Sequence, residues 1–534
     1  MSDSTTANAN RLPLLRVPRC GEGHPAATLD CYDIAMLLGA LVYLAANLFA
    51  SPDTPFLLGG DQASFWLYAQ RQLYGEQVYR DFMQFTPPGT ALIYLWLFRL
   101  FGPRIWVPNL IVMLLGLPVT WLCLRLARRI MRPAYALLAV GLFLVLIYGK
   151  LLNATHYWFS LPFALGAILV LQESRTSARA ALAGALLGAA SFFTQTRGPA
   201  AALAVSAVML LEQYRIQEPW SVYVQRQLSL LAAMITTWLA LSMYYLLTLG
   251  PGQLWFYQVA YVSQYVTRDP SVLPSLLASF RLPRSLHELS TEFESVVAYG
   301  ALPVVYVVSL WECWKDRNPA SSSGWACSAM LGAVGTAMFL EVAPSINWFR
   351  VYCGAATPGI LLLVWLVSER VRLPAHALRL AWIGVLGLAA HQTWSRHLAQ
   401  PVIEQLPAGR VATTAVMGQK LEWFATHTAP GQFFLDAAGL SLYLPLTLRN
   451  PIFLETLEDY RENLYVGRNK RELEGRHVQY VLWLPRFDSR RLQLGELRDF
   501  FHEHYHRVWT FSDHSEIWER NPDSVPAAPK GTDR

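Results

Sequence analysis

Acidic, basic and aromatic side chains are concentrated in residues 51–103, directly after the first long apolar segment. Asp61 lies in GDQASFW, and Arg80 and Asp81 lie in VYRDFMQF. Charged groups are costly beside hydrocarbon, so several of them next to an apolar segment indicate a functional site. Carboxylates there can remove a proton from a hydroxyl group, and guanidinium groups can hold a phosphate.

Cationic residues in other short segments are candidates for the same chemistry. Lys150 and His156 lie in KLLNATHYW, Arg197 in TQTRGP and Arg350 in SINWFR. Lys150 and His156 also have a structural interpretation, as polar side chains at helix ends near an interface. Arg197 and Arg350 are harder to explain in this way. On the orientation predicted below, both lie in short loops outside the cytoplasm, whereas arginines of membrane proteins are usually concentrated in cytoplasmic loops.

The two acids of the first loop have structural interpretations too. Asp61 follows two glycines and can cap a surface helix. Asp81 can form a local pair with its neighbour Arg80. The residues alone leave the catalytic and structural alternatives open for both acids.

The composition predicts a polytopic membrane protein. Hydrophobic residues make up 54% and charged residues 15% of the 534 residues, and the net charge is +6. The mean hydropathy of +0.27 is too high for a soluble enzyme of this length. The arginines form short clusters between apolar runs, which is typical of membrane orientation, so we expect no nucleic-acid partner.

The apolar runs predict about eleven transmembrane helices. With residues 1–32 as a cytoplasmic tail, the Arg and Lys clusters fall on alternate loops and all face the cytoplasm. The first loop, 51–103, and all residues after 392 then face the opposite side. In that loop we expect an amphipathic helix on the membrane at about 62–74 and a short interfacial or re-entrant helix at 89–101. The expected spans are 33–50, 104–127, 134–148, 157–172, 179–195, 199–212, 228–248, 295–313, 325–341, 351–369 and 376–392.

Residues 393–520 have ordinary charge density and mixed periodicity, which predicts a small extracytoplasmic α/β domain. Residues 521–534, with three prolines, are expected to be a disordered tail. The expected fold class is therefore an all-α polytopic membrane domain at 33–392 followed by this small domain. Its predicted elements are strands at 431–436, 477–485, 507–511 and 515–520 and an amphipathic helix at 496–505.

The motif GDQASFW after the first span, followed by VYRDFMQFTPPGTALIYLWLFRLFG, resembles the PMT-related bacterial glycosyltransferases of the GT-C fold, such as lipid A aminoarabinose transferases. TQTRGP, the Arg-containing loop before a late span and the C-terminal domain extend the resemblance. It implies a multi-pass enzyme of the cytoplasmic (inner) membrane, working on its outer face. It also implies a polyprenyl-phosphate sugar donor and an extracytoplasmic acceptor, which can be a lipid, a glycan or a protein.

The resemblance also assigns roles to residues. Asp61 becomes the catalytic base and Asp81 a second acid at the same cleft. Many relatives have Asp-Glu after the first span, whereas this chain has Asp61 followed by Gln62, which leaves the use of a divalent metal open. The candidate substrate-binding residues are Gln62, Arg80, Lys150, His156, Arg197 and Arg350.

Two other classes of protein remain as alternatives. A small-molecule transporter or lipid flippase would also be polytopic, but such proteins usually place ionisable residues near the membrane midplane and have repeated halves. Here the charges gather at one face and we find no internal repeat. A non-catalytic scaffold would leave the crowded first loop unexplained, so the sequence favours an enzyme.

Overall fold

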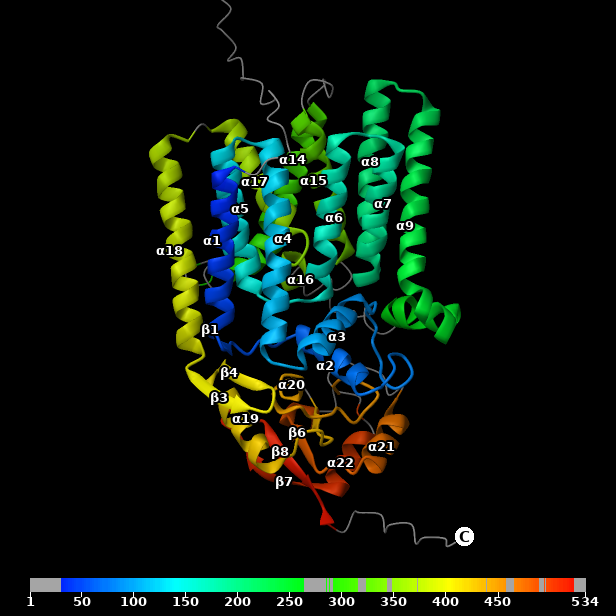
Figure 1. The fold of residues 1–534 in the computed structure, drawn as a ribbon, viewed down its shortest axis with the longest axis vertical. Coiled ribbons are helices and arrows are strands. Elements are labelled where there is room, and N and C mark those ends of the chain that lie inside the picture. The colour runs from blue at the N-terminus through cyan, green and yellow to red at the C-terminus, as the bar shows by residue number, and fades with distance from the viewer. Residues whose placement is uncertain are drawn as a thin grey trace, which may run out of the picture.

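The computed structural model is a bundle of long helices with a strand-containing part at one end (Figure 1). Most of the predicted cytoplasmic tail at 1–32 and of the predicted disordered tail at 521–534 lies outside the described residues. The residues that the structure describes are 30–263, 285, 288, 292–315, 323–342, 348–371, 373–437, 439–457, 465–488, 494 and 496–522.

A helix coincides with each of the predicted apolar runs. Within the described residues, five of these helices are long and apolar enough to cross a membrane, and the others are shorter or more polar. The number of spans therefore stays a prediction. The helices of the bundle are α1 (Cys31–Leu48), α4 (Trp106–Ile130), α5 (Pro133–Leu142) with its extensions η1 (Phe143–Tyr148) and η2 (Gly149–Leu151), α6 (His156–Glu173), α7 (Ser177–Phe193), α8 (Arg197–Ile216), α9 (Trp220–Leu249), α13 (Phe293–Val296) with η5 (Val297–Ala301) and α14 (Leu302–Lys315), α15 (Ser323–Glu341), α17 (Ala356–Arg370) and α18 (Ala375–Ala399).

Small residues allow a close contact between helices α7 and α9. A Cβ atom on Gly184 would lie 2.0 Å from the carbonyl oxygen of Leu230, and one on Gly188 would lie 2.3 Å from that of Met234. Glycine at both positions therefore lets the two backbones touch, as is common between membrane helices.

Two helices of the first loop, α2 (Gln62–Leu73) and α3 (Gly89–Phe101), lie between the bundle and the C-terminal part (Figure 1). Their bounds agree with the predicted segments 62–74 and 89–101. Most of α2 is buried by protein, including Trp66, Gln70 and Arg71, so the helix does not present one face to solvent, and its position on the membrane surface stays a prediction. Polar side chains on α2 are covered by residues more than 300 positions further along the chain, a contact that helical periodicity cannot reveal.

The C-terminal part contains a mixed four-stranded sheet in the order β5-β6-β8-β7. β5 and β6 are parallel, and the other two pairings are antiparallel. Every element predicted from residue 431 onward is present, whereas the domain boundary at residue 393 stays a prediction. The elements are the hairpin β3 (Val402–Leu406) and β4 (Gly409–Thr413), α19 (Ala415–His427), β5 (Leu435–Asp436), α20 (Tyr443–Leu446), α21 (Val466–Gly475), β6 (Tyr480–Trp483), α22 (Glu496–His504), β7 (Tyr505–Thr510) and β8 (Glu516–Arg520).

Buried polar contacts attach α2 to the C-terminal part. The Arg71 guanidinium donates to Glu76 Oε2 at 2.6 Å and to the carbonyl oxygen of Ile452 at 2.7 Å. The Tyr68 hydroxyl donates to Glu455 Oε2 at 2.6 Å. Because a buried charge is stable only when its hydrogen bonds are satisfied, these contacts fix how α2 sits against the C-terminal part.

Candidate functional site

Asp61 precedes α2 but does not cap it. It occupies the N-cap position with helical backbone angles, and its side chain makes no capping hydrogen bond. The side chain is reachable from solvent, yet enough protein surrounds it that desolvation raises the pKa of its carboxyl group, and the opposing effect of the Arg350 charge is smaller. Among the described residues, no hydrogen bond or salt bridge engages this carboxylate. The helix-capping interpretation therefore has no support in the geometry.

Arg350 lies on the short helix α16 (Trp348–Tyr352), just before α17. Its charge acts on Asp61 and also on the ring of His156. Cys353, three residues further on, interacts electrostatically with both Asp61 and Arg197. The structure therefore brings Asp61, His156, Arg197 and Arg350 together from four separate segments of the chain. We call these residues the Asp61 group.

Arg197, the first residue of α8, is completely buried and forms an ion pair with Glu341 at the end of α15. Its Nε lies 2.7 Å from Glu341 Oε2, while its Nη1 and Nη2 atoms have no hydrogen-bond partner among the described residues. The guanidinium group also lies over the ring of Tyr157 at 5.6 Å. A buried guanidinium group with unused donors is a ready site for an anion.

Gly354 makes room for that guanidinium group. A Cβ atom on Gly354 would lie 2.8 Å from Arg197 Nη1 and 2.9 Å from Nη2. A side chain at this position would have to displace the guanidinium group or the turn, so glycine lets Arg197 approach the turn between α16 and α17.

Gln62 and His156 join the first loop to the segment that precedes α6. Gln62 is fully buried, and its Oε1 accepts a hydrogen bond of 2.9 Å from the backbone NH of Ala154. Its Nε2 has no partner within the described residues. His156 Nδ1 lies 2.9 Å from Thr194 Oγ1, which links it to the loop that carries Arg197.

Lys150 forms an ion pair with Glu294 in which Nζ and Oε1 are 2.5 Å apart. No interaction of Lys150 with the Asp61 group occurs in the described part of the chain. The role of Lys150 in substrate binding thus stays a prediction. The contact that Lys150 does make is an ion pair at a helix end.

Asp81 and Arg80 pair with each other. Arg80 Nη2 is 2.8 Å from Asp81 Oδ2, and the same carboxylate accepts a hydrogen bond from the backbone NH of Gln77. The hydrogen bond from Arg80 is the main cause that holds the pKa of Asp81 below its ordinary value. No contact between Asp81 and Asp61 occurs in the ranges that the structure describes, so the geometry favours a local pair over a second acid in the same cleft.

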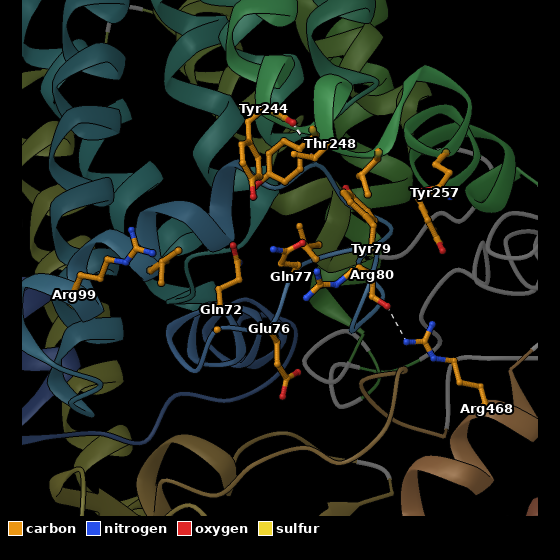
Figure 2. Close-up of a pocket in the computed structure, with 16 residues that line it drawn as sticks. Gln72, Glu76, Gln77, Tyr79, Arg80, Arg99, Tyr244, Thr248, Tyr257 and Arg468 are labelled. Atoms are coloured by element: carbon orange, nitrogen blue, oxygen red, sulfur yellow. Dashed lines mark hydrogen bonds between the residues drawn. The ribbon is translucent and has the colours of Figure 1, made fainter.

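Arg80 instead lines a cavity of about 600 Å³ between the first loop and the end of α9 (Figure 2). Arg99 of α3 and Arg468 of α21 line it as well, together with Tyr244 and Tyr257. This cavity includes no member of the Asp61 group.

Sequence reasoning missed Glu341 and Gly354. Glu341 is the acid that ends an apolar run, just before the segment that contains Arg350. A lone carboxylate at the end of an apolar run was a usable signal, but nothing local indicates its pairing with Arg197, 144 residues away. As for metals, no group of three or more His, Cys, Asp or Glu side chains is suitably placed in the described segments.

No protein-family model matches the chain, and no curated protein sequence matches it significantly. Solved structures do match. ArnT from Cupriavidus metallidurans, bound to undecaprenyl phosphate, superposes with a TM-score of 0.59 at 12% identity over 93% of this chain and 99% of that one. The apo state of the same protein gives a TM-score of 0.56 with equal coverage.

The likeness extends over nearly the whole length of both chains, so it includes the bundle, the first loop and the C-terminal part. ArnT is a glycosyltransferase of the GT-C fold. The fold of this chain is therefore the GT-C fold, as the first-loop motif predicted. At 12% identity the comparison establishes the fold alone, and the function has to be argued from the site.

Proposed function

We propose that the chain is a membrane glycosyltransferase that moves a sugar from a polyprenyl-phosphate donor to a hydroxyl-bearing acceptor at one face of the membrane. The observation that carries the proposal is the convergence of Asp61, just before α2, with Arg350 of α16 and with Arg197 and His156, the first residues of α8 and α6. A carboxylate there can take the proton that a hydroxyl group must lose, and the guanidinium groups can hold a phosphate at a membrane surface. The acceptor can be a lipid, a glycan or a protein.

In the proposed reaction Asp61 removes the proton of the acceptor hydroxyl. The acceptor oxygen then forms a bond with the anomeric carbon, while the bond from that carbon to the phosphate oxygen breaks and its electron pair stays on the phosphate. A single displacement of this kind inverts the anomeric configuration. The raised pKa of Asp61 suits a base, because a carboxylate is a stronger proton acceptor when its charged form is less well solvated.

The leaving polyprenyl phosphate gains negative charge as the glycosidic bond breaks. Arg197 offers two unused donors in a buried environment, and Arg350 adds a second positive charge near Asp61. Donors that are already in position stabilise this charge without reorganisation. Gln62 and His156 would order the loops around the sugar, and Lys150 and the Arg80–Asp81 pair would act outside the reacting group.

The test is Asp61→Asn, which keeps the shape of the side chain but removes its basicity. Sugar transfer from a polyprenyl-phosphate donor should fall about a thousand-fold, as expected for loss of a general base. Asp81→Asn is the matched comparison, because it changes the other acid of the same loop, and most of the transfer should survive in it.

The pH profile of kcat/KM gives a second readout of the same variant. Since the base must be deprotonated and its pKa is raised, transfer in the wild type should decline on acidification at a pH above the ordinary aspartate value of 3.8. That acidic limb should be absent from the residual activity of Asp61→Asn. Transfer at the wild-type rate in Asp61→Asn would remove Asp61 from the mechanism, and a large loss in Asp81→Asn alone would move the role to Asp81.

A further inference from the structure

The cavity beside Arg80 is not part of the Asp61 group and has its own chemistry. Its lining combines guanidinium groups with tyrosine hydroxyls, a threonine hydroxyl and side-chain amides, which are groups that bind phosphate and sugar or glycerol oxygens. In the view of Figure 2, Arg99 and Arg468 lie on opposite sides of the cavity and Tyr244 and Thr248 lie above it. The polar groups used in this argument are Arg80, Arg99, Arg468, Tyr244, Thr248 and Gln253.

The charges around the cavity favour an anion. Glu76 is its acidic lining residue, and Arg71, Arg449 and Arg476 all lie within ion-pair distance of that carboxylate, at 2.6, 3.3 and 3.8 Å. Its negative charge is therefore more than compensated.

The arginines of the lining differ in how they are held. Arg80 pairs with Asp81, and Arg468 pairs with Glu472 while donating to the carbonyl oxygen of Arg80 at 2.8 Å. These contacts use part of the donor capacity of both guanidinium groups. Arg99 is exposed and takes part in no ion pair within the described ranges. Arg99 is thus the cation of the cavity with the most capacity for a new partner.

Exposed apolar side chains lie on α9, whose C-terminal end lines the cavity. Leu239, Met243 and Leu247, spaced four residues apart on one face of α9, are 38%, 47% and 78% exposed. Tyr244 and Thr248, which line the cavity, neighbour this stripe in sequence. On the other side, Trp96 of α3 is 63% exposed next to Arg99. A ligand that fills the cavity can therefore extend an apolar tail along α9, a helix of spanning length that is mostly exposed.

We propose that this cavity binds the headgroup of an anionic phospholipid, with the phosphate near Arg99, the far end of the headgroup toward Arg468 and the acyl chains along α9. The charge of the lining selects a phosphate-bearing headgroup, and the adjoining apolar stripe selects a lipid over a soluble phosphate. The proposal is independent of the sugar transfer proposed above, because it concerns other residues.

The test measures lipid binding by the full-length, detergent-purified chain with native mass spectrometry. Phosphatidylglycerol should bind more tightly than phosphatidylcholine, and Arg99→Gln should weaken phosphatidylglycerol binding about tenfold, as expected for loss of one charge-assisted contact. Arg468→Gln is a second variant and should act in the same direction. Arg104→Gln is the matched control, because Arg104 is exposed five positions from Arg99 and lies outside the cavity lining, and it should bind the lipid as the wild type does.

Two results would overturn the proposal. One is equal phosphatidylglycerol binding by the wild type, Arg99→Gln and Arg468→Gln. The other is displacement of bound phosphatidylglycerol by glycerol 3-phosphate at the same concentration, which would assign the cavity to a free phosphate compound. Lipid binding is read without an activity assay, so failure here leaves the role of Asp61 untouched, and failure of Asp61→Asn leaves this proposal untouched.

Discussion

At the scale of single residues, the buried pair of Arg197 and Glu341 decides how the proposed phosphate site works. The carboxylate uses Nε of the guanidinium group, which leaves Nη1 and Nη2 for another partner. Glu341 thus both stabilises the buried positive charge and orients it. An arginine held in this way is prepared for a ligand phosphate before the ligand arrives.

The pair can be tested by changing its members separately and together. Either single variant, Arg197→Gln or Glu341→Gln, leaves one charge buried without its partner and should destabilise the protein by about 3 kcal/mol. The double variant removes both charges and should recover most of the unfolding temperature measured in detergent. Its apparent KM for the polyprenyl-phosphate donor should nevertheless remain raised by about ten- to a hundred-fold, because the phosphate contact is lost.

The double variant separates a binding role from a structural one. If it is as stable as the wild type and uses the donor equally well, the pair serves only to hold α8 against α15. Glu341→Gln alone provides the control for the loss of orientation, since it keeps the guanidinium group.

At the scale of elements, the turn between α16 and α17 positions two members of the Asp61 group. Arg350 lies on α16, and Gly354 follows it within the turn and contacts the guanidinium group of Arg197. Any movement of this turn therefore changes the distance between the two proposed phosphate ligands.

Gly354→Ala tests that relation with the smallest possible change. The added methyl group would meet Arg197 Nη1 at 2.8 Å and must displace either the guanidinium group or the turn. We expect a loss of about 1–3 kcal/mol in stability, typical of overpacking, together with weaker donor use in the transfer assay. Gly384→Ala in α18 is the matched control, because no atom lies within 4 Å of its Cβ position, and it should leave both measurements unchanged or slightly raise stability. Equal behaviour of the two variants would mean that the turn adapts without affecting Arg197.

At the scale of the whole molecule, the C-terminal part and the helix bundle share α2. Tyr68, Gln70 and Arg71 of α2 all donate hydrogen bonds to residues of the C-terminal part. Asp61 immediately precedes the same helix, so these contacts help to position the proposed base relative to the bundle.

Arg71→Gln should therefore loosen the attachment of the C-terminal part to the bundle. Its guanidinium group is buried and bridges Glu76 with the backbone at Ile452, so its removal should cost about 3 kcal/mol and increase proteolysis between 400 and 520. Arg410→Gln is the control: Arg410 pairs with Asp53 at the surface, and such exposed pairs contribute about 0–1 kcal/mol. An Arg71→Gln protein as stable and as protease-resistant as Arg410→Gln would show that other contacts hold α2.

The sequence determined the local properties of this protein. Apolar runs predicted the helices of the bundle, alternation and amphipathicity predicted β6, α22, β7 and β8, and the motif around Asp61 predicted the GT-C fold. These features could be predicted because each depends on residues close together in the chain, through hydrogen bonding within a helix or the two faces of a strand.

Only the tertiary structure decided which charged residues lie together. It paired Arg197 with Glu341, brought Arg350 near Asp61, paired Asp81 with its neighbour Arg80, and buried the polar face of α2 against the C-terminal part. The physical reason is that such contacts join segments up to several hundred residues apart, and their geometry depends on how whole helices pack. A charge pattern identifies which side chains need partners, and the packing of the helices then determines which partners they receive.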